Sequence, residues 1–190
     1  IFPVREADIP IRIKNTFRPE DEGTEIVPTS RHTYSGRRVT GVAGKKNFTV
    51  IFLEKSLMNA EIGFTYRVLA VFLKHGISFE HIPTGIDTMS FVVDSAILKN
   101  GVLEEVCAEI QENVRPDNLR IINDIALIAV VGHGMARSVG TSARLFEAIA
   151  RAGVNVRMID QGSSELNIIV GVDNENYERT LKAVYEEFFE

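Results

Sequence analysis

The residues best suited to bind a ligand lie at the start of a helix that the sequence predicts from about Gly63. The first backbone N–H groups of this helix, near Gly63, Phe64 and Thr65, have no partners within the helix and carry the positive end of its dipole. A carboxylate is a natural ligand there, and a glycine lets it approach the backbone closely. Further along, Ser78 could offer an oxygen to an ammonium group, and Glu80 could offer a negative charge. Together these groups would recognise a small zwitterion.

Other kinds of chemistry have little support in the sequence. The four histidines show no metal-ligand spacing, and no phosphate-binding lysine loop of the Walker type is present. The one cysteine, Cys107, lies on the apolar side of an expected helix and is interpreted as a buried, inert thiol. Without a second cysteine there is no disulfide framework, which fits a reducing cytoplasm. The sequence therefore predicts no catalytic residue, no metal site and a cytoplasmic location.

The helix near Gly63 belongs to an internal repeat with a period of about 77 residues. Residues 49–85 align with residues 126–162 without a gap. The glycines at both ends of the helix match in the two copies, Gly63 with Gly140 and Gly76 with Gly153. Glycine after a helix is typical of a left-handed end, so matching glycines indicate a matching backbone.

Each copy predicts the order strand, helix, strand, strand. The apolar runs indicate strands at 50–53, 77–82 and 89–93 in the first copy, and at 127–131, 154–159 and 166–170 in the second. The first copy continues into a helix at 102–114 and a strand at 119–122, which completes a βαββαβ unit. The second copy reaches a helix at 176–189 and ends, so it lacks its fourth strand. The fold class is therefore predicted as α+β.

A predicted strand at 39–42, outside both copies of the repeat, could supply the fourth strand that the second copy lacks. It has no hairpin partner nearby, and an uncovered sheet edge is a liability that folded proteins usually fill. We therefore expect residues 39–46 and 125–190 to form the second unit, with the first unit, 47–124, inserted into it. Pairing of the spare strand with an upstream domain is the alternative. The glycine and serines near residues 31–38 indicate a linker.

Composition and charge narrow the possible partners. The chain has 190 residues, of which 45% are hydrophobic, so it can bury one or two modest cores. A net charge of −5 argues against nucleic acid as a partner. No apolar run approaches the roughly 18 residues that span a bilayer, so no membrane partner is expected. Residues 1–30 cannot bury a core of their own and start without methionine, and we interpret them as the trailing end of a domain that has been cut away.

Two motifs and the repeats carry a resemblance to a known family. The run IPIRIKNTFRPEDEGT at 9–24, the two repeats, and QGSSELNIIV at 161–170 resemble the C-terminal part of aspartokinase, which phosphorylates aspartate. The resemblance implies that the two units are ACT domains, ferredoxin-like modules that bind amino acids, with the first inserted into the second. It also implies feedback regulation by an end-product amino acid and a homodimer formed through the ACT domains.

The resemblance implies that the catalytic residues lie in a kinase domain outside this chain. In the family a kinase domain with a Lys-Phe-Gly-Gly-Ser motif precedes this region, and the motif does not occur in this chain. We therefore expect this part to be inactive alone and to need no cofactor, with ATP and Mg belonging to the full-length enzyme. The resemblance makes four polar residues neighbours of the nucleotide, namely Lys14, Asn15, Arg18 and Thr24. A polar connecting loop is the alternative for them.

The resemblance also implies where the effector binds. Lysine-inhibited relatives use the positions of Met58, Glu61, Gly63, Phe64, Thr65, Ser78, Phe79 and Glu80. The position of Glu61 is typically serine in them and that of Glu80 typically aspartate, which keeps a preference for a cation, so lysine is the first candidate and threonine the second. Residues 78–80 follow the far end of the helix and must run back or come from another copy. A possible second site consists of Met135, Gly140, Thr141, Asn155 and Val156.

Simpler interpretations compete at each position. Met58 and Met135 could fill the core, and Gly63 and Gly140 could serve only to start a helix. Arg67 and its repeat mate Arg144 are expected on the polar helix face, exposed or paired with acidic neighbours. A function of a different class also fits this fold, a ligand-free ferredoxin-like module for dimerisation or interaction, because fold does not determine function.

Overall fold

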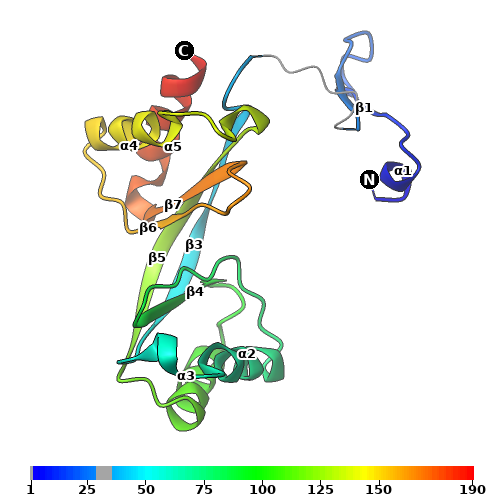
Figure 1. The fold of residues 1–190 in the computed structure, drawn as a ribbon. Helices are drawn as coiled ribbons and strands as arrows, with labels where there is room; N and C mark the ends of the chain where they lie inside the picture. The colour runs from blue at the N-terminus through cyan, green and yellow to red at the C-terminus, as the bar shows by residue number, and fades with distance from the viewer. Residues whose placement is uncertain (1, 29–35) are drawn as a thin grey trace. The chain divides into compact units, whose positions relative to one another are not determined.

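The computed structural model describes residues 2–28 and 36–190, and the chain divides into two compact units, Ile1–Arg37 and Arg38–Glu190. The first unit contains α1 (Phe2–Glu6), β1 (Ile11–Ile13) and β2 (Thr24–Ile26) (Figure 1). The two strands pair antiparallel. Gly23, with a φ of 74°, turns the chain into β2, and a Cβ there would lie 2.3 Å from the carbonyl oxygen of Ile13.

The second unit is built on a five-stranded antiparallel sheet with the order β4-β3-β5-β7-β6. Its central strands, β3 (Gly41–Glu54) and β5 (Asn118–Val131), are each 14 residues long. The sequence predicted two separate strands along each of them, and this prediction was wrong. Asn47 and Asp124 have positive φ angles of 70° and 59°, and the β3–β5 register shifts near them, so the chain continues through a bulge instead of turning away.

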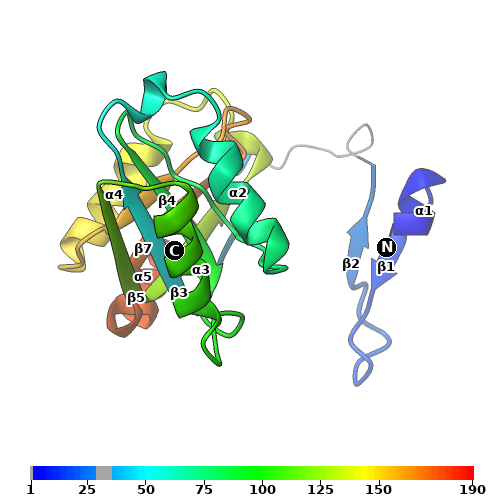
Figure 2. The same cartoon turned by 90° about the horizontal axis from the view of Figure 1, so that it is seen from below.

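One end of the long strands forms the first ACT-like half. There β3 pairs with β4 (Thr88–Asp94), and β5 pairs with the same part of β3. The helices α2 (Phe64–Lys74) and α3 (Val102–Asn113) cover this end, which Figure 2 shows from below. Their apolar stripes and the strands enclose a core in which Ile51, Phe72, Phe91 and Ile110 are buried.

The other end of the strands forms the second half. Gly41–Lys45 of β3 pair with Leu127–Val131 of β5. On its other side β5 pairs with β7 (Asn167–Asp173), and β7 pairs with β6 (Met158–Asp160). The helices α4 (Thr141–Arg151) and α5 (Tyr177–Phe189) pack on this end (Figure 1). The α+β fold with the first ferredoxin-like unit inserted into the second is confirmed.

The predicted strand at 77–82 is absent from the described structure. Only the isolated bridges His81↔Val92 and Thr84↔Met89 join this segment to β4. Pro83 has no N–H to donate, which interrupts the ladder. In the second half, β6 begins at Met158, four residues later than predicted. Short 3₁₀ helices lie at Met58–Ala60 (η2), His133–Met135 (η3) and Asn174–Asn176 (η4).

Within the described residues, no helix is long and apolar enough to cross a membrane. A third cluster of buried apolar side chains, including Phe48, Val50, Ile125 and Leu127, joins the two halves on the sheet face opposite the helices' cores. The two halves therefore form one body that places two similar helix N-termini at its surface.

Candidate functional site

In the first half, the predicted effector residues divide between core and surface. Met58 in η2 and Phe64 at the start of α2 are buried in the first core, whereas Gly63 and Thr65 are exposed. Gly63 is the N-cap residue of α2 with a φ of 81°, a conformation that glycine adopts at least cost. Met58 and Phe64 therefore support the loop from beneath, whereas Gly63 and Thr65 lie at its surface, and their contact with an effector stays a prediction.

Glu61 is already neutralised by two cations of the same chain. Its carboxylate forms an ion pair with Arg67 and lies 3.5 Å from the amine of Lys55. All three side chains are about one-third exposed or less. A preference for a cationic effector at Glu61 stays a prediction, and the local charge of this trio is net positive.

In the described structure, the N-terminus of α2 lies apart from three other residues of the predicted effector site, Ser78, Phe79 and Glu80. The N–H of Glu80 donates to the carbonyl of Val92 at 2.8 Å. Val92 lies four residues along β4 from Thr88, which pairs with the end of β3 where the loop begins, so the separation along the strand is about 13 Å. Within one copy of the chain, the two groups are therefore apart.

The second half carries a pocket of about 280 Å³ at the N-terminus of α4. Two residues of the predicted second site line it: Met135, which is buried, and Thr141, which is only 3% exposed. The Thr141 hydroxyl donates to the carbonyl of Ser138 at 3.3 Å. The rest of the wall includes Arg137, Ser138, Ser142, Gln161, Glu165 and Ile168.

The polar wall of this pocket is held in an unusual backbone conformation. Arg137 and Glu165 have φ angles of 58° and 57°, a left-handed region that costs a non-glycine residue about 1 kcal/mol or more. The backbone N–H of Arg137 donates to the Glu165 carboxylate at 2.6 Å. Arg137, Glu165 and the N-terminus of α4 thus line a pocket whose apolar side chains are Met135 and Ile168, a combination of groups that could pair with a zwitterion carrying a small side chain.

Not every predicted second-site residue lines the pocket. Gly140 is adjacent to it as the N-cap residue of α4, with a φ of 90°. Asn155 is exposed and Val156 packs against the second core, both beyond the other end of α4. Arg137 and Glu165 were missed, and the only sequence signal for Glu165 was its place in the QGSSE motif.

The predicted nucleotide neighbours form a self-contained loop in the first unit. Lys14 donates to the carbonyl of Pro19, and the Asn15 side chain accepts the N–H of Phe17 at 2.9 Å. The N–H of Arg18 donates to the carbonyl of Asn15, and Thr24 pairs with Ile13. All are exposed. No group of three metal-ligating side chains occurs in residues 2–28 or 36–190.

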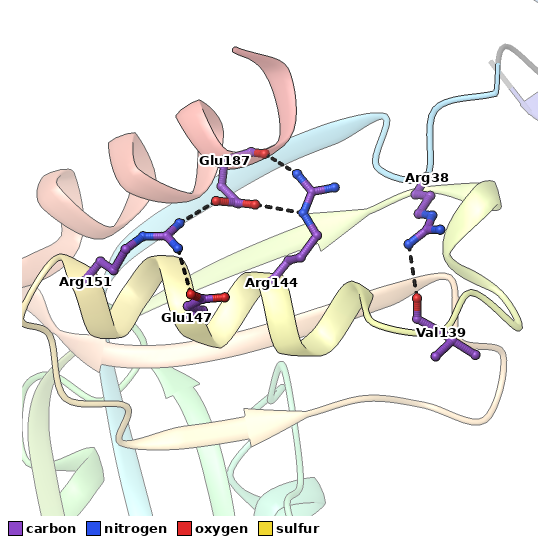
Figure 3. Close-up of polar contacts among 6 residues, drawn as sticks. All are labelled: Arg38, Val139, Arg144, Glu147, Arg151 and Glu187. Atoms are coloured by element: carbon purple, nitrogen blue, oxygen red, sulfur yellow. Dashed lines mark hydrogen bonds and ion pairs between the residues drawn. The ribbon is translucent and has the colours of Figure 1, made fainter.

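The carboxylate of Glu187 on α5 binds two arginines of α4 (Figure 3). Arg144 donates from Nε to Oε1 of Glu187 at 2.7 Å and from Nη2 to the Glu187 carbonyl at 2.6 Å, and Arg151 donates to Oε2. These arginines, Arg144 first, hold the pKa of Glu187 below its usual range. The expectation that Arg67 and Arg144 pair with acidic neighbours is confirmed.

Glu187→Gln is expected to lower the unfolding temperature at pH 7 by roughly 2–4 °C, because it removes the charge that both arginines hold. The folded-state pKa is depressed, so this stabilisation is present above the usual glutamate pKa of about 4.3 and is lost as the pH falls through the folded-state value. Thermal unfolding between pH 7 and pH 3 checks it. The wild type and the variant should converge on the acid side, and an equal gap at every pH would contradict the account.

Comparison with known proteins relates this chain to ACT domains and to aspartokinases. A family model described as the ACT domain matches residues 128–188, which contain the pocket's helix α4 and the strands around it. Aspartokinase 3 of Bacillus subtilis is 38% identical over 189 residues, covering 100% of this chain and 41% of that protein.

Solved structures agree over the whole chain. The aspartate kinase of Clostridium acetobutylicum, described as an allosteric enzyme, is 44% identical with a TM-score of 0.93, covering 99% of this chain and 43% of that one. E. coli aspartokinase III in complex with lysine and aspartate has a TM-score of 0.77 at 23% identity, covering 100% of this chain and 41% of that one, a likeness that shows the fold alone. The chain therefore spans less than half of these relatives, and its resemblance to the regulatory C-terminal region of aspartokinases is confirmed over its whole length.

Proposed function

We propose that this chain senses an end-product amino acid and transmits its level to an aspartate kinase of which it is the regulatory part. The full-length enzyme would use ATP and Mg to phosphorylate aspartate, the first step toward lysine, threonine and methionine. The single observation that supports sensing is the pocket of about 280 Å³ in the second half, which combines groups of both charges with an apolar floor.

A zwitterion fits this pocket in one orientation. Its carboxylate would accept from the N-terminal amides of α4, near Ser142, and from the Arg137 guanidinium. Its ammonium group would donate to Glu165 and Gln161. The side chain would then lie over Met135 and Ile168, where there is no further carboxylate among the lining residues.

This orientation separates the two candidate effectors. Threonine needs only a small apolar surface and a hydroxyl partner, which Ser138 and Thr141 supply, so we propose threonine for the second half. Lysine carries a second ammonium group that needs its own acceptor. We therefore propose that lysine, the ligand named for the E. coli relative, binds in the first half, where Glu80 of one copy would complete the loop at Gly63 of another. Homodimerisation and a cytoplasmic location stay predictions.

The experiment that tests sensing is a thermal-shift series of the chain against the twenty amino acids at millimolar concentration. A ligand that binds only the folded form raises the unfolding temperature by mass action. A shift with threonine or lysine supports the proposal. If no amino acid gives a shift, either the site needs the kinase domain or the chain is a ligand-free dimerisation or interaction module, and the proposal that this chain senses an amino acid by itself fails.

Glu165→Gln is expected to weaken threonine binding about tenfold or more, because the amide cannot neutralise the ammonium group. The change keeps the size of the side chain and one acceptor oxygen. Calorimetric titration measures the dissociation constant. Glu175→Gln is the matched control, since Glu175 is an exposed carboxylate in η4 of the same half. Equal affinities for the two variants would remove Glu165 from the site.

A further inference from the structure

The segment that leads into the second unit touches the loop that forms the pocket. Arg38 donates from Nη1 to the carbonyl of Val139 at 3.1 Å (Figure 3), and Val139 lines the pocket. The N–H of Thr40 donates to the carbonyl of Val131 at 2.8 Å, just before this loop begins. Between these contacts, Val39 is only 3% exposed and lies in the same core cluster as Met135.

The contact is backbone to backbone at Gly132. A Cβ added there would lie 2.1 Å from the carbonyl oxygen of Arg38 and 2.9 Å from the Cα of Val39. The N–H of Gly132 also donates to the carbonyl of Leu166 at 2.9 Å, next to Glu165. The loop at 132–140 is thus held on one side by residues 38–40 and on the other by the turn that carries the pocket's carboxylate.

We propose that Arg38, Val39 and Thr40 are positioning residues of the second-half pocket. They hold the 132–140 loop in the form that binds the amino acid, although none of them lines the pocket. This inference rests on the proposed function, because it concerns the regulation of the same site.

Thermodynamic linkage makes the coupling work in both directions. If docking of residues 38–40 strengthens binding, then a bound amino acid strengthens their docking by the same factor. The two states are the docked and undocked segment, and the ligand shifts them only by its difference in affinity. Since residues 38–40 continue directly into β3 from the upstream unit, occupancy of the pocket would be transmitted to the connection between the two units.

The test uses the whole chain with threonine as the probe and two readouts, because lysine is proposed to bind the first half. Arg38→Ala is expected to weaken binding about three- to tenfold, the range for one hydrogen bond. Arg38→Lys, which keeps a donor, should restore most of the affinity, and Arg37→Ala, at the exposed neighbouring residue, should bind as the wild type does. Hydrogen exchange of the Thr40 amide should slow when the probe binds the wild type, and not in Glu165→Gln.

The outcomes separate this proposal from the function on which it rests. If threonine binds the wild type, but Arg38→Ala binds threonine equally well and the Thr40 amide does not respond, the positioning role is wrong and sensing stands. If threonine does not bind the wild type, the threonine site of the second half and the positioning role both fail. A third outcome also overturns the proposal: Arg38→Ala binds more weakly, Arg38→Lys does not restore the affinity, and hydrogen exchange of the Thr40 amide does not change. Arg38 would then be only a structural contact.

Discussion

Phe91→Ala is expected to lower the free energy of unfolding by about 3–5 kcal/mol, the largest effect of any single change considered. Phe91 is fully buried in β4, and the centroid of its ring lies 4.6 Å from the ring centroid of Phe72 and 5.9 Å from that of Phe79. Removing it takes apolar area from the first core and leaves a cavity between α2 and the sheet. Urea denaturation, with its midpoint and slope, measures the loss.

The matched control is Tyr66→Ala on α2, where the aromatic side chain is 75% exposed. Its effect should stay within about 0.5 kcal/mol. Comparable losses for the two variants would mean that the first half does not fold around Phe91. Because the partly exposed Phe79 ring packs edge-on against the rings of Phe72 and Phe91, the same change should free it on one side.

Gly132→Ala is expected to lower the free energy of unfolding by roughly 1–3 kcal/mol through overpacking against the backbone. Gly132 has an extended φ of 174°, so the cost does not come from its own conformation. It comes from the Arg38 carbonyl, which occupies the place of the added methyl group. Residues 38–40 or the pocket loop must move, so amino-acid affinity should fall as well.

Gly162→Ala is the control for this change, because nothing lies within 4 Å of its added Cβ. It should leave stability nearly unchanged while sitting in the turn that precedes Glu165. Chemical denaturation and titration of both glycine variants decide the matter. If Gly132→Ala were as stable as the wild type and bound equally well, the close contact between Gly132 and Arg38 would not exist in solution.

The repeat made most of the fold predictable. Glycines at matching helix ends reproduced the same local backbone twice, and Gly63 and Gly140 both adopt left-handed N-cap conformations. The missing strand of the second copy identified the insertion. What the sequence did not indicate was that β3 and β5 each run through both halves. Asn47 and Asp124 adopt positive φ angles near the shift in the β3–β5 register, and strand pairing continues on both sides of them.

The pocket was predictable only in part, for a topological reason. The family resemblance, carried through the repeat, located Met135, Gly140 and Thr141. Arg137 and Glu165 lie in separate loops, and the antiparallel pairing of Val131 with Asn167 brings those loops together. No spacing rule in a single sequence encodes that contact. Glu61 shows the converse, since its charge suggested a ligand contact while Arg67 and Lys55 already neutralise it.

The most direct test of amino-acid sensing is a crystal structure of the chain grown with threonine at saturating concentration. We expect the amino acid in the second-half pocket, with its carboxylate at the N-terminus of α4 beside Arg137 and its ammonium group within hydrogen-bond distance of Glu165. An empty pocket under those conditions, or threonine bound elsewhere without contact to α4 or Glu165, would contradict the account.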